Sequence, residues 1–129
     1  MRVLLAEDDA DLREVAGMLL RSWGCETPAV ADGGAAQDLL EQGERFDVLV
    51  LDFDMPVRSG LEVAVRARGL GHAGPVVVWT GWSGPVSQEQ VERWDLVLMS
   101  KYDVYELGAV VSDLRTEGGP VGDVSRPLP

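Results

Sequence analysis

The polar residues of this sequence that could bind a metal ion or a phosphate stand just after short, largely apolar runs. They are Glu7 and Asp8 after residues 3–6, Asp52 after residues 47–51, Thr80 after residues 76–79, and Lys101 two positions after residues 96–99. Such runs are typical of strands that are covered on both faces of a parallel sheet. Because ligands bind at the carboxyl ends of the strands in these sheets, we expect the five side chains to converge at one edge.

Three of these residues carry carboxylates, and their mutual repulsion predicts a bound cation. Two carboxylates about 4 Å apart repel by roughly 4 kcal/mol at an effective dielectric constant of about 20. Glu7, Asp8 and Asp52 could stay ionised together only beside a cation, unless one of them binds a proton. A site of carboxylate oxygens with room for water suits Mg²⁺, and Mn²⁺ is an acceptable substitute.

The remaining polar groups are of the kind that stabilises a phosphoryl group during transfer. Lys101 supplies a positive charge, Thr80 supplies a hydroxyl donor, and Gly81 has no side chain to keep its backbone N–H away from a ligand. Together with a cation, these groups would offset the charge of the phosphoryl. Asp52 then becomes the candidate nucleophile and would form an acyl phosphate. The phosphoryl would draw Thr80 and the glycine-rich loop after it inward, which predicts a two-state switch.

Helical patterns separate the apolar runs. Apolar residues recur at helix spacing over residues 11–23. Further helices are expected at residues 34–42, 61–68, 87–94 and from 103 onward. Ser87 with Gln90 forms a predicted capping box for the fourth helix, and Asp103 with Glu106 is the predicted cap of the fifth.

The alternation of strands and helices predicts the fold class. A second strand is expected at residues 25–31, at an edge of the sheet because Pro28 has no N–H to donate. Five strands that alternate with five helices predict an α/β fold with a doubly wound parallel sheet and helices on both faces. The chain is predicted to divide into one domain, residues 1–116, and a flexible tail or truncated linker, residues 117–129, which has no periodicity.

The composition excludes several classes of function. The 129 residues carry a net charge of −11 at pH 7, so direct binding to nucleic acid is not expected. No apolar run approaches the roughly 20 residues that span a bilayer. The sequence also turns acidic at Glu7, too early for a signal peptide. A cytoplasmic domain without a membrane partner is predicted, and the lone Cys25 suits a reducing compartment.

In their order along the chain, these motifs resemble the receiver domain of bacterial two-component response regulators. The motifs are Glu-Asp after the first strand, Asp-x-x-Met-Pro-x-x-x-Gly at residues 52–60, a strand that ends in Thr80 and a strand that leads to Lys101. The resemblance covers residues 2–115 and implies a flavodoxin-like sheet with strand order 2-1-3-4-5. Each motif is common by itself, whereas their order and spacing are specific to the family.

The resemblance also implies a role for each site residue. Glu7, Asp8 and Asp52 would bind Mg²⁺ together with the backbone carbonyl of Asp54. Asp52 would accept the phosphoryl group from a histidine kinase or a phosphotransfer protein. The phosphoryl group would be bound by Thr80, Lys101 and the backbone N–H groups of Phe53 and Gly81. A domain of this kind catalyses only its own phosphorylation and dephosphorylation, so an enzyme for another substrate is not expected, and homodimers are compatible with the resemblance.

Three positions depart from the pattern of the family. Tyr102 stands where the lysine is usually followed by proline, so the turn after the fifth strand could differ. Leu98 occupies the position of the family's switch aromatic, which puts the usual coupling between threonine and aromatic in doubt. Trp82 is large enough to restrict access to an acyl phosphate on Asp52. Asp54 could orient attacking water or repel it, so the lifetime of the phosphoryl group stays open.

Two other readings of the sequence remain. The Asp-x-Asp of residues 52–54, with a later threonine and lysine, also occurs in haloacid-dehalogenase-type phosphatases, but those enzymes carry Asp-x-Asp on their first strand and a further acidic motif after the lysine. The second alternative is a receiver-like binding module that signals without phosphorylation, which the residues at Leu98 and Tyr102 favour. Turnover of a generic phosphate ester would distinguish the phosphatase, and uptake of a phosphoryl group on Asp52 would distinguish a phosphoacceptor from the binding module.

Overall fold

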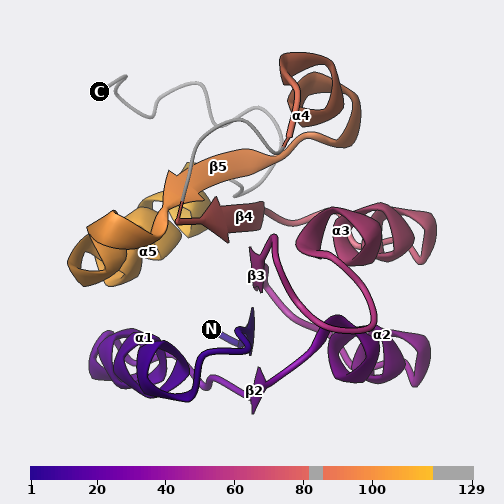
Figure 1. The fold of residues 1–129 in the computed structure, drawn as a ribbon. Coiled ribbons are helices and arrows are strands. Elements are labelled where there is room, and N and C mark those ends of the chain that lie inside the picture. Colours follow the sequence, from indigo (N-terminus) through magenta and orange to yellow (C-terminus); the bar gives the residue numbers. More distant parts are fainter. Residues whose placement is uncertain (82–85, 118–129) are drawn as a thin grey trace.

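A five-stranded parallel sheet forms the centre of the structure, a computed structural model that describes residues 1–81 and 86–117 (Figure 1). The strand order is β2-β1-β3-β4-β5. The strands are β1 (Val3–Ala6), β2 (Ala29–Val30), β3 (Val48–Asp52), β4 (Val76–Thr80) and β5 (Val97–Ser100). The predicted fold class and strand order are therefore confirmed.

A helix follows each strand. These helices are α1 (Ala10–Ser22), α2 (Gly33–Glu41), α3 (Gly60–Gly69), α4 (Gln88–Trp94) and α5 (Leu107–Glu117), and a 3₁₀ helix, η1 (Lys101–Glu106), precedes α5. Figure 1 shows α1 and α5 on one face of the sheet and α2 and α3 on the other. Among residues 1–81 and 86–117, no helix combines the length and the apolar character needed to cross a bilayer.

Each face of the sheet has its own apolar core, because alternate side chains of a strand point to opposite faces. On β1, Val3 and Leu5 pack in the core beneath α1 and α5, whereas Leu4 and Ala6 pack in the core beneath α2 and α3. All four side chains have no exposed surface. Burial on both faces explains why the strands appear in the sequence as continuous apolar runs.

The second strand is shorter than predicted. Only Ala29–Val30 forms a strand, in place of residues 25–31, and Glu26 adds an isolated bridge to Arg2. Pro28 lies between them and has no N–H to donate, although its carbonyl accepts a hydrogen bond from the Leu5 N–H at 3.0 Å. The prediction that Pro28 marks an edge strand is confirmed.

The predicted capping box at Ser87 and Gln90 is present at the start of α4. The predicted start of the final helix is wrong. Asp103 lies inside η1 with φ −95° and ψ 24°, which is not helical, and α5 begins only at Leu107. The cap is instead Ser100, whose hydroxyl accepts a hydrogen bond from the Tyr102 N–H at 3.1 Å. The serine that ends β5 thus starts a 3₁₀ helix before the predicted cap is reached.

The loop between β3 and α3 contains a strained residue. Val57 has a φ of +74°, a left-handed conformation that a β-branched side chain rarely adopts, and its side chain is 71% exposed. We expect Val57→Gly and Val57→Asn to raise the free energy of unfolding by about 0.5–1 kcal/mol, because both residues tolerate this conformation and little packing is lost. Urea denaturation measures the change. Val57→Ala keeps a Cβ in the same backbone conformation, so its free energy of unfolding should rise less. A lower free energy of unfolding in Val57→Gly would contradict the assignment of strain.

Candidate functional site

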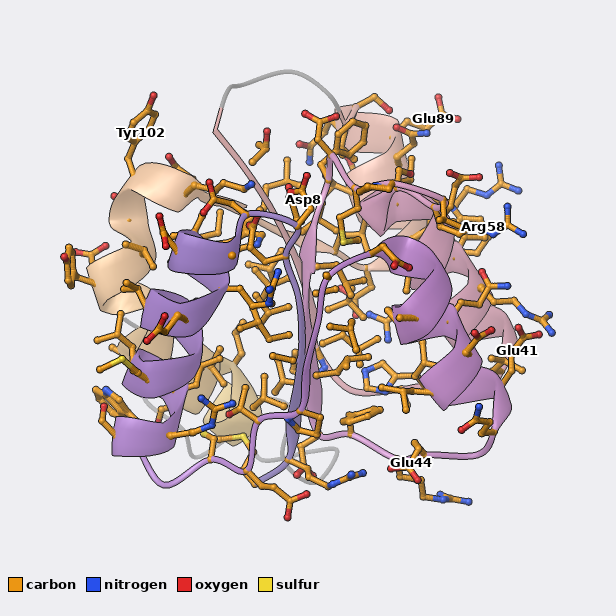
Figure 2. All side chains as sticks on the ribbon, turned by 60° about the horizontal axis from the view of Figure 1, so that its bottom comes forward. Asp8, Glu41, Glu44, Arg58, Glu89 and Tyr102 are labelled. Atoms are coloured by element: carbon orange, nitrogen blue, oxygen red, sulfur yellow. The ribbon has the colours of Figure 1, made fainter. Side chains whose placement is uncertain are left out.

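The structure brings three carboxylates together at the carboxyl ends of two neighbouring strands. Glu7 follows β1, Asp52 ends β3, and these strands pair in parallel with Ala6 opposite Leu51. Glu7, Asp8 and Asp52 each offer a carboxylate oxygen, and these oxygens all lie within 4.8 Å of one another. Glu7 and Asp52 are 0% and 1% exposed, whereas Asp8 is exposed and lies at one end of the molecule in Figure 2.

Lys101 joins the cluster from the end of β5. Its ammonium Nζ lies 3.0 Å from Oε1 of Glu7 and 2.9 Å from Oδ2 of Asp52. It also donates a hydrogen bond to Oε2 of Glu7 at 3.3 Å. One ammonium therefore bridges two buried carboxylates that are far apart in the sequence, and their positions depend on one another.

The environment shifts the pKa values of this cluster in different directions. Burial raises the pKa of Asp52 to about 7, with the neighbouring Asp8 and Glu7 adding to the rise and Lys101 opposing it. For Lys101, burial acts to lower the pKa, but its hydrogen bonds to Asp52 and Glu7 outweigh burial and raise it. For Asp8, burial acts to raise the pKa, but its interactions with Asp52, Glu7 and Lys101 outweigh burial and lower it.

The cluster fits a divalent cation. Oε1 of Glu7 and Oδ2 of Asp52 are buried, and the Lys101 ammonium lies 3.0 Å from the first and 2.9 Å from the second. A single ammonium leaves three carboxylates under-compensated in charge. Buried carboxylate oxygens beside an exposed third carboxylate form the hard-oxygen set that Mg²⁺ or Mn²⁺ prefers, with solvent available at Asp8.

Backbone amides orient the other carboxylate oxygens. The Asp9 N–H donates to Oε2 of Glu7 at 2.9 Å, and the Asp54 N–H donates to Oδ1 of Asp52 at 3.1 Å. Asp9 itself caps α1, since its side chain accepts a hydrogen bond from the Leu12 N–H at 2.9 Å. These contacts hold one oxygen of each buried carboxylate and direct the other toward Lys101.

Arg13 is a residue of this region that sequence reasoning missed. Its Nη1 donates to the backbone carbonyl of Glu7 at 2.8 Å and contacts that of Asp8 at 3.4 Å. The loop that carries both carboxylates is thereby fastened to the first turns of α1. A surface arginine on a helix gives no sequence signal of this contact, because its acceptors are backbone carbonyls that every residue has.

The predicted phosphoryl-binding groups lie at the same end of the sheet. Thr80 ends β4 opposite Ser100 of β5 and is half-buried. Gly81 follows it and is exposed, and a Cβ at this glycine would meet no atom of the described residues within 4 Å. The Phe53 N–H already donates to the carbonyl of Trp79 at 2.9 Å. Phe53 would therefore have to share this N–H with a phosphoryl group.

Gly60 lies beside the backbone of Asp52, where no other residue would fit. A Cβ at Gly60 would lie 2.4 Å from the carbonyl oxygen of Asp52 and 3.1 Å from Cα of Phe53. The Gly60 N–H donates to the carbonyl of Phe53 at 3.0 Å and closes the loop onto the end of β3. The glycine of the Asp-x-x-Met-Pro-x-x-x-Gly motif thus fixes the backbone that presents Asp52.

Two of the three departures from the family pattern lie in described parts of the chain. Leu98 is 46% exposed on β5. Lys101 and Tyr102 open η1, and no peptide bond among the described residues is cis. Trp82, the third departure, lies outside the described residues. The turn after β5 therefore differs from a proline turn, as the sequence suggested it could.

Comparison with known proteins gives the class to which this fold and site belong. The family model described as the response regulator receiver domain matches residues 3–99. The chain belongs to the receiver domain family of response regulators, the signalling modules of two-component systems.

One relative is similar to this chain in sequence, and one solved structure shares its fold. The chain is 44% identical over 80 residues to the response regulator protein PmrA of Pseudomonas aeruginosa, which covers 62% of this chain and 36% of PmrA. This chain thus spans about a third of the length of that relative. The receiver domain of the Francisella response regulator 1452 superposes with a TM-score of 0.79 at 22% identity, covering 90% of this chain and 97% of the other.

A further similar structure is a complex with Mg²⁺. The response regulator TrrA of Thermotoga maritima, in complex with Mg²⁺ and BeF, superposes with a TM-score of 0.76 at 27% identity. The superposition covers 88% of this chain and 97% of the other.

Proposed function

We propose that this domain accepts a phosphoryl group on Asp52 and relays it as a change of surface to a partner protein. The observation that carries the proposal is the convergence of Glu7, Asp8, Asp52 and Lys101 at one edge of the sheet. Three carboxylates around one ammonium have no structural advantage, since burying charges costs free energy. The binding of a cation and a phosphoryl group would explain why these charges are buried despite the cost in free energy.

In the proposed reaction, Asp52 is the nucleophile. A carboxylate oxygen of Asp52 forms a P–O bond as the bond between phosphorus and the donor breaks, and the donor leaves with the electron pair of that bond. With a histidine kinase or a phosphotransfer protein as donor, the broken bond is P–N and the leaving group is an imidazole. The product is an acyl phosphate on Asp52.

The other residues of the cluster act by charge and position. The ammonium of Lys101, now beside Oδ2 of Asp52, would neutralise the added phosphoryl oxygens. Thr80 would donate its hydroxyl to the same group from the end of β4. Glu7, Asp8, Asp52 and the carbonyl of Asp54 would hold Mg²⁺, which supplies electrostatic stabilisation of the transferring phosphoryl. Asp9 and Arg13 would hold the loop that carries Glu7 and Asp8 in place.

We also propose that the protein acts in the cytoplasm. Histidine kinases draw their phosphoryl groups from nucleotides, so the reaction belongs in the cytoplasm. A cognate kinase or phosphotransfer protein and a downstream protein are the expected partners, and the domain would turn over no substrate other than its own phosphoryl group.

The affinity for Mg²⁺ should depend on pH. Because Asp52 has a pKa of about 7, protons compete with the cation below that pH, and the affinity should rise about tenfold between pH 6 and pH 8. Trp79, which pairs with Asp52 in the sheet, offers a fluorescence signal for the titration. Asp52→Asn should bind Mg²⁺ more weakly and without this pH dependence. A wild-type affinity that stays constant over this range would contradict the site.

Phosphorylation itself is tested with acetyl phosphate and Mg²⁺. We expect the intact protein to gain the mass of one phosphoryl group, the modified peptide to contain Asp52, and Asp52→Asn to gain none. Asp54→Asn, with its exposed side chain, is the matched control and should still be modified. A wild-type protein that takes up no phosphoryl group would favour the phosphorylation-independent binding module. Steady turnover of a generic phosphate ester would favour the phosphatase.

A further inference from the structure

The burial of the six side chains of η1 repeats every three residues, with one half-buried side chain followed by two exposed ones. Asp103 interrupts the helical backbone, so η1 consists of two short turns that join at a kink. Lys101 and Val104 face inward, toward the carboxylate cluster and the core beneath α5. The outward pairs are Tyr102 with Tyr105 and Asp103 with Glu106, all of them exposed.

The two tyrosines are the most exposed large apolar side chains of the described residues. Tyr102 is 84% exposed and Tyr105 is 80% exposed, and Leu98 on the neighbouring β5 is 46% exposed. Figure 2 shows Tyr102 pointing into solvent at the same end of the molecule as Asp8. Two neighbouring exposed tyrosines favour contact with a partner, since tyrosine is enriched among the residues that dominate the energetics of protein interfaces.

We propose that Leu98, Tyr102, Asp103, Tyr105 and Glu106, here called the η1 surface, bind a protein segment that carries arginine or lysine among apolar side chains. This inference rests on the proposed function, because it names the surface through which the phosphorylated state is read. The tyrosine rings offer apolar contact and cation–π partners, and the two acids on the adjoining face offer countercharges.

The acidic charge of the η1 surface determines which kind of partner can bind there. The only basic residue of η1 is Lys101, whose ammonium is held between Glu7 and Asp52 rather than at the surface. A second copy of this chain would bring two acidic surfaces together, and each chain carries a net charge of −11. Nucleic acids and anionic membranes are repelled for the same reason. A cationic, partly apolar protein segment is the complementary partner.

The η1 surface is connected to Asp52 through the backbone of η1. Lys101 is the first residue of η1 and contacts the carboxylate of Asp52, so a phosphoryl group that draws the ammonium away from Glu7 pulls on this helix. Beneath it, Val104 packs against the same core cluster as Trp79. The indole Nε1 of Trp79 is buried without a hydrogen-bond partner among the described residues. An arrangement that gives this N–H an acceptor is therefore favourable, and the core under η1 can repack.

The binding test uses a short synthetic peptide of alternating arginine and leucine and follows amide resonances during titration. We expect perturbations centred on residues 98–106. Tyr102→Ala with Tyr105→Ala should weaken the affinity by about tenfold or more, and Asp103→Asn with Glu106→Gln by about fivefold. All four side chains are exposed, so these variants should fold normally.

Matched controls separate the η1 surface from general acidity. Glu89→Gln with Glu92→Gln on α4 removes the same charge from exposed positions and should change the affinity less than about twofold. Met18→Ala removes an apolar side chain that is 61% exposed on α1 and should have no effect. Equal losses in the α4 and η1 acid variants, or perturbations spread over the acidic surface, would overturn the proposal. So would a dimer that depends on the two tyrosines, measured by sedimentation, because it would assign the surface to a second copy.

A second arm tests the connection to Asp52. In the presence of Mg²⁺ and beryllium fluoride, a phosphoryl mimic, the affinity for the peptide should change at least about threefold in the wild type and not in Asp52→Asn. If acetyl phosphate modifies Asp52 but the affinity stays constant, the η1 surface is not the reading surface and the proposed function stands. If Asp52 is never modified, the proposed function fails, and the peptide titration alone decides whether the η1 surface binds.

Discussion

Lys101→Met is expected to lower the free energy of unfolding by about 3 kcal/mol at pH 8 without Mg²⁺, because it leaves Glu7 and Asp52 buried without their countercharge. The loss should shrink toward pH 5. Asp52 already has a folded-state pKa above its ordinary value, and removing the ammonium raises it further. The folded state then binds a proton that the unfolded state releases, so stability rises as the pH falls from 8 to 5.

Urea denaturation at both pH values measures this effect, and a double variant is the control. In Lys101→Met with Asp52→Asn, one of the two buried charges is gone, so a large part of the loss should be recovered. The phosphorylation rate with acetyl phosphate should fall by about 100-fold or more in Lys101→Met. Lys101→Arg keeps the positive charge and is the charge-conserving test. A Lys101→Met protein of unchanged stability at pH 8 would contradict the bridging ion pair.

Arg68→Ala is the second change with a large expected effect, and it acts far from the carboxylate cluster. The guanidinium of Arg68 donates to four backbone carbonyls, those of His72 and Gly74 after α3 and those of Trp94 and Asp95 at the end of α4, at 2.7–2.9 Å. Truncation removes the Arg68 donor from all four. We expect a loss of about 3 kcal/mol in the free energy of unfolding, since each bond to a charged donor contributes about 1.5 kcal/mol or more and water replaces part of them.

Arg66→Ala, on the same helix, is the matched control for Arg68→Ala. Arg66 makes one exposed ion pair, with Glu41 at 2.8 Å, and exposed pairs contribute at most about 1 kcal/mol. Arg68→Lys keeps the charge, but one ammonium cannot reach all four acceptors. Its free energy of unfolding should therefore fall by about half as much as that of Arg68→Ala. Urea denaturation distinguishes these cases. Equal losses for Arg66→Ala and Arg68→Ala would show that the four carbonyls find other donors.

The fold could be predicted because its signals are local. The apolar run of residues 3–6 and the capping box at Ser87 each lie within a few residues, and each appears in the structure as the predicted element. Parallel topology then fixes which strand ends are neighbours. The convergence of Glu7 and Asp52 follows from β1 and β3 lying side by side.

Elements with competing local signals were predicted less well. Ser100 and Asp103 are both suitable caps, and the sequence does not show that Ser100, the last residue of β5, starts η1 first. The strand predicted around Pro28 was too long, because only two residues align with β1 before the chain turns away. In both cases the outcome depends on where a neighbouring strand ends, which is a property of the sheet.

The sequence by itself determined which residues could do chemistry, where they lie along the chain and which α/β fold places them at one edge. Tertiary structure alone decided that Glu7 and Asp52 are buried, that Lys101 lies between them, and that Arg13 and Arg68 bind backbone carbonyls. The physical reason is that pKa values and ion-pair strengths depend on burial and on distances of a few ångströms. Lys101 and Glu7 are 94 positions apart in the sequence, so no local pattern contains the 3.0 Å that separates their charges.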